Sequence, residues 1–152
     1  MYENKGREKM KNIGIIKKFD ELGRILIPIE IRRSIGIKEK DAIDIFLEGE
    51  NIIINKVNST EKVFGFIRYV DELGRIVIPI EIRNYLKIVE KCPVEVYLEG
   101  NRVILKKHYT KCIYCNEKNN LYNILEKPIC DKCVTKIKEE IDKTKSLNNL
   151  LK

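Results

Sequence analysis

An internal duplication constrains the fold of this chain more strongly than any other feature of its sequence. Shifting the sequence by 51 residues aligns residues 14–57 with residues 65–108, and 22 of the 44 aligned pairs are identical. The match is strongest where FDELGRILIPIEIR, at 19–32, meets VDELGRIVIPIEIR, at 70–83. Similarity that recurs at a fixed spacing indicates repeated structural units. The sequence therefore predicts two copies of one small fold, followed by a segment of another kind.

Each copy opens with the pattern of a strand and a tight turn. The predicted strands cover 14–19 and 65–70, and each runs into the sequence Asp-Glu-Leu-Gly. Gly23 and Gly74 can supply the positive φ that such a turn often needs, because glycine lacks a Cβ. A second, β-branched strand follows each turn.

Proline then ends each β-branched run and begins a short helix. Pro28 and Pro79 suit the first turn of a helix, where the missing N–H costs no hydrogen bond. The segments 28–36 and 79–87 are therefore predicted to be helical, and Gly36 is a natural stop for the first of them. A hairpin with apolar residues at alternate positions is predicted after each helix. Its inward-facing residues are Ile43, Ile45 and Leu47 in the first copy and Val94, Val96 and Leu98 in the second.

One copy, of about 45 residues, is too small to bury an adequate core alone. Each copy must therefore pair with another. The simplest assembly is an internal pseudo-dimer, in which the hairpins of the two copies interleave within one chain. The alternative is that each copy pairs with its counterpart in a second chain. The short connection at 58–62 favours pairing within the chain, and the sequence alone leaves both arrangements open.

The string DELGRIxIPIEIR, with a basic pair before it and a Glu-Gly hairpin after it, closely resembles the DNA-binding domain of the AbrB and SpoVT family of transition-state and sporulation regulators. The likeness covers nearly all of both copies. It implies a mainly β fold of the α+β kind, in which two swapped-hairpin repeats form a double-split β-barrel. It also implies double-stranded DNA as the partner, with a preference for flexible, AT-rich sequences that are read by their shape.

By position, the resemblance assigns eight cationic side chains to a DNA-facing surface. They are Lys17, Lys18, Arg24, Arg32 and Arg33 in the first repeat and Arg68, Arg75 and Arg83 in the second. The second repeat departs from the pattern at Tyr69, which stands in the place of Lys18, and at Asn84, which stands in the place of Arg33. These departures imply a weaker second half and an asymmetric DNA face.

Arginine suits such a surface because its planar guanidinium can bind a phosphate through two hydrogen bonds. The formal net charge of +7 is compatible with a polyanionic partner. The alternative for Arg24 and Arg75 is that they pair with acidic residues of their own turns and merely hold those turns in place. Carboxylates recur beside these arginines without a histidine, serine or cysteine partner, so the chain is not expected to be an enzyme.

Four cysteines follow the repeats at the spacing of a metal site. Cys112 and Cys115 form one C-x-x-C pair and Cys130 and Cys133 form another, with 14 residues between the pairs. Four thiolates in two such pairs can bind one zinc ion tetrahedrally, and the site would be structural because no ligand position is left open. The alternative is a redox-active or disulfide-forming set of thiols.

The sequence around the cysteines predicts a small zinc finger with a C-terminal helix. A short hairpin is expected near 121–125, and Val134, Ile137 and Ile141 share one face of a helix that follows the second cysteine pair. The arrangement resembles a treble-clef finger, which implies a role in dimerisation or in contact with a protein partner, and contact with DNA is the alternative. Because the module contains little apolar material, we expect it to need its metal to fold.

These features divide the chain into an N-terminal tail (1–12), a first repeat (13–57), a linker (58–62), a second repeat (63–109) and the zinc-binding module (110–152). No apolar run approaches the length of a membrane span, and the start of the chain lacks the apolar stretch of a secretory signal. We therefore expect a cytoplasmic protein without membrane contact. The leading hypothesis is a bacterial DNA-binding transcription regulator, either a repressor or a global modulator. The alternatives are the antitoxin of a toxin–antitoxin pair and a protein-interaction adaptor that does not bind DNA.

Overall fold

The computed structural model describes residues 11–151 of the 152-residue chain. The chain forms two compact units, and the boundary between them lies between His108 and Tyr109. Most of the predicted N-terminal tail, 1–12, lies outside the described residues. Its last two residues, Lys11 and Asn12, belong to the first strand.

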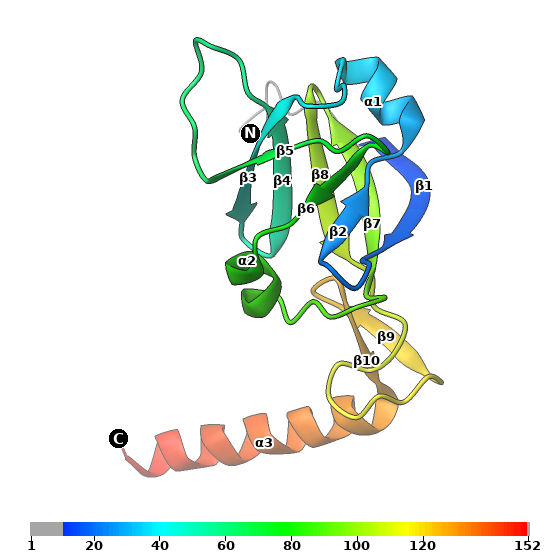
Figure 1. The fold of residues 1–152 in the computed structure, drawn as a ribbon. Helices are drawn as coiled ribbons and strands as arrows, with labels where there is room; N and C mark the ends of the chain where they lie inside the picture. The colour runs from blue at the N-terminus through cyan, green and yellow to red at the C-terminus, as the bar shows by residue number, and fades with distance from the viewer. Residues whose placement is uncertain (1–10, 152) are drawn as a thin grey trace. The chain divides into compact units, whose positions relative to one another are not determined.

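Antiparallel strands from both repeats build the first unit (Figure 1). The first repeat contributes β1 (Lys11–Lys18), β2 (Arg24–Leu26), α1 (Ile29–Ile35), β3 (Ala42–Glu48) and β4 (Asn51–Lys56). The second repeat contributes β5 (Phe66–Tyr69), β6 (Arg75–Val77), α2 (Ile80–Tyr85), β7 (Pro93–Glu99) and β8 (Arg102–Lys107). One six-stranded sheet has the order β1-β7-β8-β4-β3-β5, and β2 and β6 form a separate two-stranded ribbon. The fold is mainly β, as the sequence predicted.

Strand pairing interlocks the two repeats. β1 of the first repeat pairs with β7 of the second, and β5 of the second repeat pairs with β3 of the first. The ladder between β4 and β8 joins the two hairpins across the middle of the sheet. The β2–β6 ribbon also joins the repeats, with Ile25 opposite Ile76 at its centre. Pairing within one chain is therefore the arrangement that the structure adopts, and the expected swapped-hairpin architecture is confirmed.

A single hydrophobic core is shared by the sheet, the ribbon and both helices. Its buried side chains come from matching positions of the two repeats, such as Ile25 and Ile76 on the ribbon and Ile31 and Ile82 on the helices. The hairpin residues that were predicted to face inward do so: Ile43, Ile45, Val94 and Val96 are buried, and Leu47 and Leu98 pack against the core. Because the core draws on both repeats, we expect neither repeat to keep its fold once the pairing is lost.

The two short helices begin alike and end differently. Pro28 and Pro79 each stand directly before the first helical residue, in agreement with their predicted role. α1 ends at Gly36, which takes the left-handed conformation at φ 71°. The equivalent residue of the second repeat is Lys87, which takes a left-handed φ of 55° although it carries a side chain. Both helices are therefore followed by a residue in the left-handed conformation, although only the first repeat has a glycine at that position.

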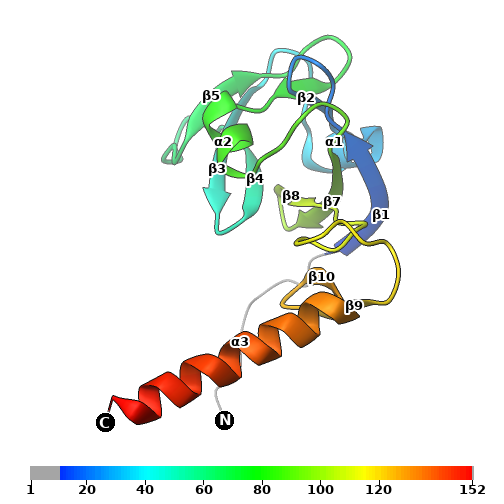
Figure 2. The ribbon, with the colours of Figure 1, turned by 90° about the horizontal axis from the view of Figure 1, so that it is seen from below.

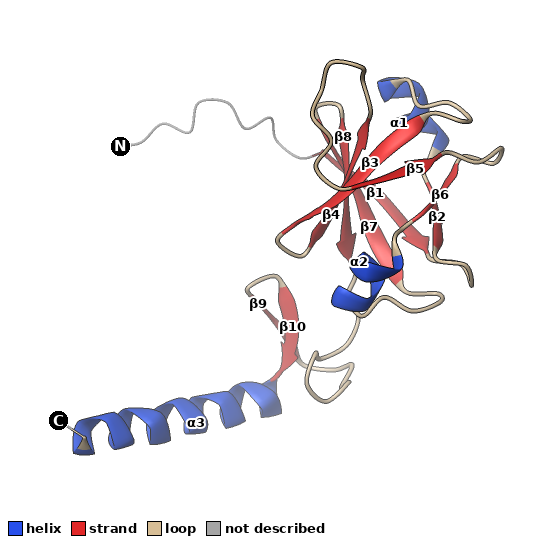
Figure 3. Cartoon of the chain, turned by 60° about the vertical axis from the view of Figure 1, so that its left-hand side comes forward, coloured by secondary structure: helices blue, strands red, loops and turns tan. Residues whose placement is uncertain are grey.

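A hairpin and a long helix form the second unit (Figure 2). The hairpin consists of β9 (Leu121–Ile124) and β10 (Lys127–Cys130), and α3 covers Asp131–Leu150. Strands dominate the first unit, whereas this one helix dominates the second (Figure 3). Both the hairpin and the helix were predicted. The small core of this unit consists of Cys112, Ile129, Cys130 and Cys133, with Leu121, Val134 and Ile137 partly buried against it.

Candidate nucleic-acid interface and metal centre

The two Asp-Glu-Leu-Gly turns are closed by their aspartates. Asp20 Oδ1 accepts hydrogen bonds from the backbone N–H groups of Leu22 (3.0 Å) and Arg24 (2.8 Å). Asp71 repeats both bonds in the second turn. Desolvation raises the pKa of Asp20, but the hydrogen bonds from Arg24 and Leu22 outweigh this effect and hold the pKa below its ordinary value. Both carboxylates are therefore ionised where they face their arginines.

Each turn arginine is bound by the aspartate of its own turn. Arg24 Nε lies 2.6 Å from Asp20 Oδ2, and Arg75 Nε lies 2.7 Å from Asp71 Oδ2. The structure therefore contains the ion pairs that were the alternative to a DNA-facing role for these two arginines. Pairing with aspartate is compatible with a DNA-facing role, because each aspartate side chain binds only the Nε atom of its arginine side chain. The side chains of Arg24 and Arg75 remain 23% and 27% exposed. Among the described residues, no hydrogen-bond partner is found for the Nη atoms of either arginine.

The helix arginines pack on the turn of the opposite repeat. Arg32 Nε donates to the carbonyl oxygen of Ile27 (2.9 Å), and a Cβ added to Gly74 would collide with the Arg32 guanidinium. Arg83 makes the equivalent contacts with the carbonyl oxygen of Ile78 and with Gly23. Each glycine thus serves two purposes, since it adopts a positive φ and also leaves room for a guanidinium. The sequence pointed to the first purpose, whereas the second depends on a contact between repeats that it does not reveal.

These contacts bring four of the predicted residues together as two matching pairs. Arg83 lies over Gly23 and is therefore next to Arg24, and Arg32 lies over Gly74 and is therefore next to Arg75. The antiparallel β2–β6 ribbon, in which Arg24 is opposite Val77 and Leu26 is opposite Arg75, separates the two pairs. The pairs are related by an approximate two-fold symmetry, and each contains one arginine from each repeat.

Three further predicted cations lie beside these pairs along the chain. Lys17 and Lys18 end β1, directly before the first turn, and Lys18 is exposed. Arg33 follows Arg32 on α1 and is also exposed. The eight cations that the sequence singled out are called the basic face from here on.

Arg68, the eighth member of the basic face, folds back along its own strand. Its Nη1 donates to the carbonyl oxygen of Ile67 (2.9 Å), and its guanidinium carbon lies 5.8 Å from the centre of the Phe66 ring. It stands near the end of β5, at the position that Lys17 has on β1. Arg68 is half-buried, whereas Lys18 is exposed.

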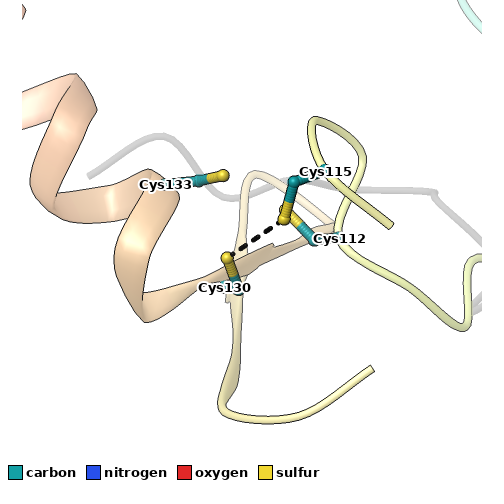
Figure 4. Close-up of side chains that lie close together, drawn as sticks. All are labelled: Cys112, Cys115, Cys130 and Cys133. Atoms are coloured by element: carbon teal, nitrogen blue, oxygen red, sulfur yellow. Dashed lines mark hydrogen bonds between the residues drawn. The ribbon is translucent and has the colours of Figure 1, made fainter. Parts of the chain in front are cut away.

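The four predicted cysteine ligands come together in the second unit (Figure 4). Their sulfur atoms all lie within 4.8 Å of one another, and Sγ of Cys115 is 3.5 Å from Sγ of Cys130. Cys112 and Cys115 belong to the loop before the hairpin, Cys130 ends β10, and Cys133 lies in the first turn of α3. A tetrahedral ion with metal–sulfur bonds of roughly 2.3 Å needs sulfurs about 3.8 Å apart. The four cysteines therefore fit one tetrahedral metal ion.

Hydrogen bonds to sulfur also suit a bound cation. Burial raises the pKa of Cys112, but backbone N–H groups of Cys130, Cys115 and Tyr114 outweigh it and lower the pKa to about 6. Burial and the neighbouring sulfurs, including the charge of Cys112, raise the pKa of Cys133 to about 12. Thiolates this close repel one another, so all four lose their protons together only with a cation between them. These four cysteines could therefore hold a metal ion.

Interlocked repeats with paired arginines, followed by a four-cysteine module, define a swapped-hairpin protein with a potential metal centre. In agreement with this class, residues 16–62 match the family model of MazE, described as antidote-toxin recognition, bacterial antitoxin. The match covers most of the first repeat and the linker.

Three proteins of Bacillus subtilis are similar to the chain. It is 53% identical to the transition state regulatory protein AbrB over 58 residues. This matched segment covers 37% of this chain and 60% of AbrB. It is 53% identical over 47 residues to the putative transition state regulator Abh, covering 31% of this chain and 51% of Abh. Stage V sporulation protein T is 38% identical over 66 residues, covering 42% of this chain and 37% of that protein. The resemblance to AbrB and SpoVT is confirmed, although the matches span only about half the length of these relatives.

In the part of the chain that the structure describes, no helix has the length and apolar character needed to span a membrane. This includes α3, whose 20 residues carry charged side chains along most of its length. Two of the relatives above, AbrB and Abh, are named as transition state regulators.

Proposed function

We propose that this protein is a bacterial transcription regulator that binds double-stranded DNA through its basic face and acts in the cytoplasm, not as an enzyme. The observation that carries the proposal is the pair of arginine clusters on either side of the β2–β6 ribbon. The similarity to two proteins named as transition state regulators supports it. Repression or global modulation is the mode of regulation that the resemblance favours.

The turn and helix arginines are suited to bind phosphate groups. The Nε atoms of Arg24 and Arg75 are bound by aspartates, and those of Arg32 and Arg83 by backbone carbonyls. Because these side chains are already ordered, less conformational entropy is lost when their Nη atoms bind a phosphate. Neutralising about six phosphates would make log K fall against log salt concentration with a slope near −5. A surface of this kind favours flexible, AT-rich DNA that can adapt to it.

Replacing Arg24 with alanine is expected to weaken DNA binding by about 1 to 3 kcal/mol while the fold stays intact. Titrations of the full chain with an AT-rich duplex at fixed salt measure the loss, and circular dichroism checks the fold. Arg102→Ala is the matched control, because Arg102 pairs with Glu48 and Glu99 at the ends of the hairpins and not with the turns. Equal losses in both variants would contradict the assignment. If the wild-type chain does not bind at low salt, the adaptor hypothesis is favoured instead.

We also propose that the ion of the cysteine cluster is zinc, bound once per chain by Cys112, Cys115, Cys130 and Cys133 in a structural site. Four sulfur ligands in tetrahedral reach are the set that structural zinc prefers. Elemental analysis of the full chain is expected to give one zinc per chain. Freshly purified, reduced protein without zinc would contradict the proposal and favour the redox alternative.

The module as a whole is proposed to contact protein, with a second copy of this chain as the first candidate. A groove of about 560 Å³ runs along α3 and is lined by Tyr114, Ile137 and Ile141 together with Lys136 and Glu140. Tyr114 and Ile141 are exposed. A native mass of twice the chain would support a homodimer, and a single-chain mass would leave a different protein as the partner.

A second candidate function is that of an antitoxin, which the match of residues 16–62 to the MazE family favours. In this chain, however, the repeats are followed by the cysteine module. Co-expression with the product of the adjacent gene separates the two functions. A neighbour that is toxic alone and harmless together with this chain would establish the antitoxin.

A further inference from the structure

Because the hairpins are swapped, cations from different repeats lie together on the basic face. Along the sequence, both departures from the pattern fall in the second repeat, where Tyr69 replaces Lys18 and Asn84 replaces Arg33. The sequence therefore predicted that the second half of the surface would be weaker. That prediction assumed that the turn and the helix of one repeat lie together.

In the structure, the helix of each repeat lies on the turn of the other. The Arg83 guanidinium of α2 packs on Gly23, and the N–H of Ile78, just before α2, donates to the Gly23 carbonyl (3.0 Å). The same contacts place Arg32 of α1 on Gly74, next to the second turn. The first half-surface therefore consists of the first turn with α2, and the second half-surface consists of the second turn with α1.

Counted in this way, the two half-surfaces contain equal numbers of the eight cations. The first contains Lys17, Lys18, Arg24 and Arg83, and the second contains Arg68, Arg75, Arg32 and Arg33. Lys18 and Arg33 are called the variable cations, because the other repeat has Tyr69 and Asn84 at the equivalent positions. Each half contains one of the two variable cations and therefore four cations in all. The expected weakness of the second half is therefore not what this structure implies.

The halves differ in where the variable cation lies. In the first half it is on the strand (Lys18), and the helix carries Asn84 and Tyr85 instead. In the second half the strand carries Tyr69 and the helix carries the cation, Arg33. Each half also has one strongly exposed tyrosine: Tyr85 is 68% exposed and Tyr69 is 67% exposed. On the strand, the cation of the first half corresponds to Tyr69 in the second. On the helix, Arg33 of the second half corresponds to Asn84 in the first, and Tyr85 is the next residue.

We propose that one chain binds its DNA in a single orientation, on a non-palindromic site whose two halves contribute equal electrostatic strength and different contacts. This inference rests on the proposed DNA binding. Palindromic sites reflect the two-fold symmetry of the protein that binds them, and here that symmetry is broken on the contact surface itself. Asparagine and arginine at equivalent helix positions favour different base edges, adenine and guanine respectively, and differ in charge toward phosphate.

Ethylation interference on a duplex selected from a random pool tests the assignment, since it maps the phosphates that binding requires. Arg24→Ala and Arg75→Ala in the full chain mark the two halves of the site. We expect Lys18→Ala to lose contacts in the half marked by Arg24, and Arg33→Ala to lose contacts in the half marked by Arg75. Each change should reduce the magnitude of the salt slope by about one.

An exchange variant tests the orientation at constant total charge. Lys18→Tyr, Tyr69→Lys, Arg33→Asn and Asn84→Arg together exchange the variable residues between the halves, and the footprint is expected to reverse on the same duplex. If Lys18 and Arg33 map to the same half, or if the segment of duplex contacted by a single chain is itself palindromic, the inference is wrong and DNA binding stands. If the wild-type chain binds no duplex, the proposed function fails and the inference fails with it.

Discussion

Replacing Cys112 with serine is expected to unfold the second unit and to leave the first unit folded. Cys112 belongs to a core in which three of the four buried residues are cysteines. Structural zinc contributes roughly 10 to 16 kcal/mol in small metal-dependent modules, which exceeds what so small an apolar core can supply. Loss of one ligand therefore removes most of the free energy that orders the hairpin and the start of α3.

Amide hydrogen exchange measures this effect unit by unit. In Cys112→Ser, protection should be lost in β9, β10 and the first turns of α3, while the six-stranded sheet keeps its protection. Cys92→Ser is the matched control, because Cys92 is a buried thiol of the first unit that lies outside the cysteine cluster. Retained zinc and retained protection in Cys112→Ser would show that the cluster does not bind the metal.

Truncating Ile76 to alanine is expected to destabilise both repeats together, by about 2 to 5 kcal/mol. Ile76 is fully buried at the centre of the β2–β6 ribbon and lies opposite Ile25 of the other repeat. A loss of this size is a large part of the roughly 5 to 15 kcal/mol that stabilises a typical domain. Because the core is shared, hydrogen exchange should accelerate in β3 and β4 of the first repeat as much as in β7 and β8.

Val77→Ala provides the comparison for this prediction. Val77 is the next residue on the same strand and is 38% exposed, so its truncation should cost no more than about 0.5 kcal/mol. Denaturant unfolding gives the free energies for both variants. Faster exchange confined to the second repeat in Ile76→Ala would show that the repeats fold independently, contrary to the interlocked core.

The sequence predicted the elements of the first unit well because their signals are local and occur twice. Pro28, Gly36 and the alternating residues of the hairpins each determine structure within a few positions of themselves. The preference for pairing within the chain was also correct, since the connection at 58–62 is short and a single repeat is small. The cysteine spacing led to the cluster for the same local reason.

What the sequence could not predict depends on contacts between the repeats. The packing of Arg32 on Gly74 joins residues 42 positions apart, and nothing in either motif indicates it. The grouping of Lys18 with α2 follows from the equivalent packing of Arg83 on Gly23, and it is the basis of our proposal that the two halves are equally strong. The left-handed conformation of Lys87 is a further case, because its residue type disfavours a positive φ and so does not signal it.

Covalent linkage of the two interlocked repeats has a consequence for how the barrel assembles. Its formation is a unimolecular reaction, so the fraction of assembled barrel does not fall when the cell contains few copies of the protein. The two halves cannot separate and recombine with halves of related proteins. A substitution in either repeat is present once in the barrel and not at two symmetry-related positions, which leaves the two repeat sequences free to diverge.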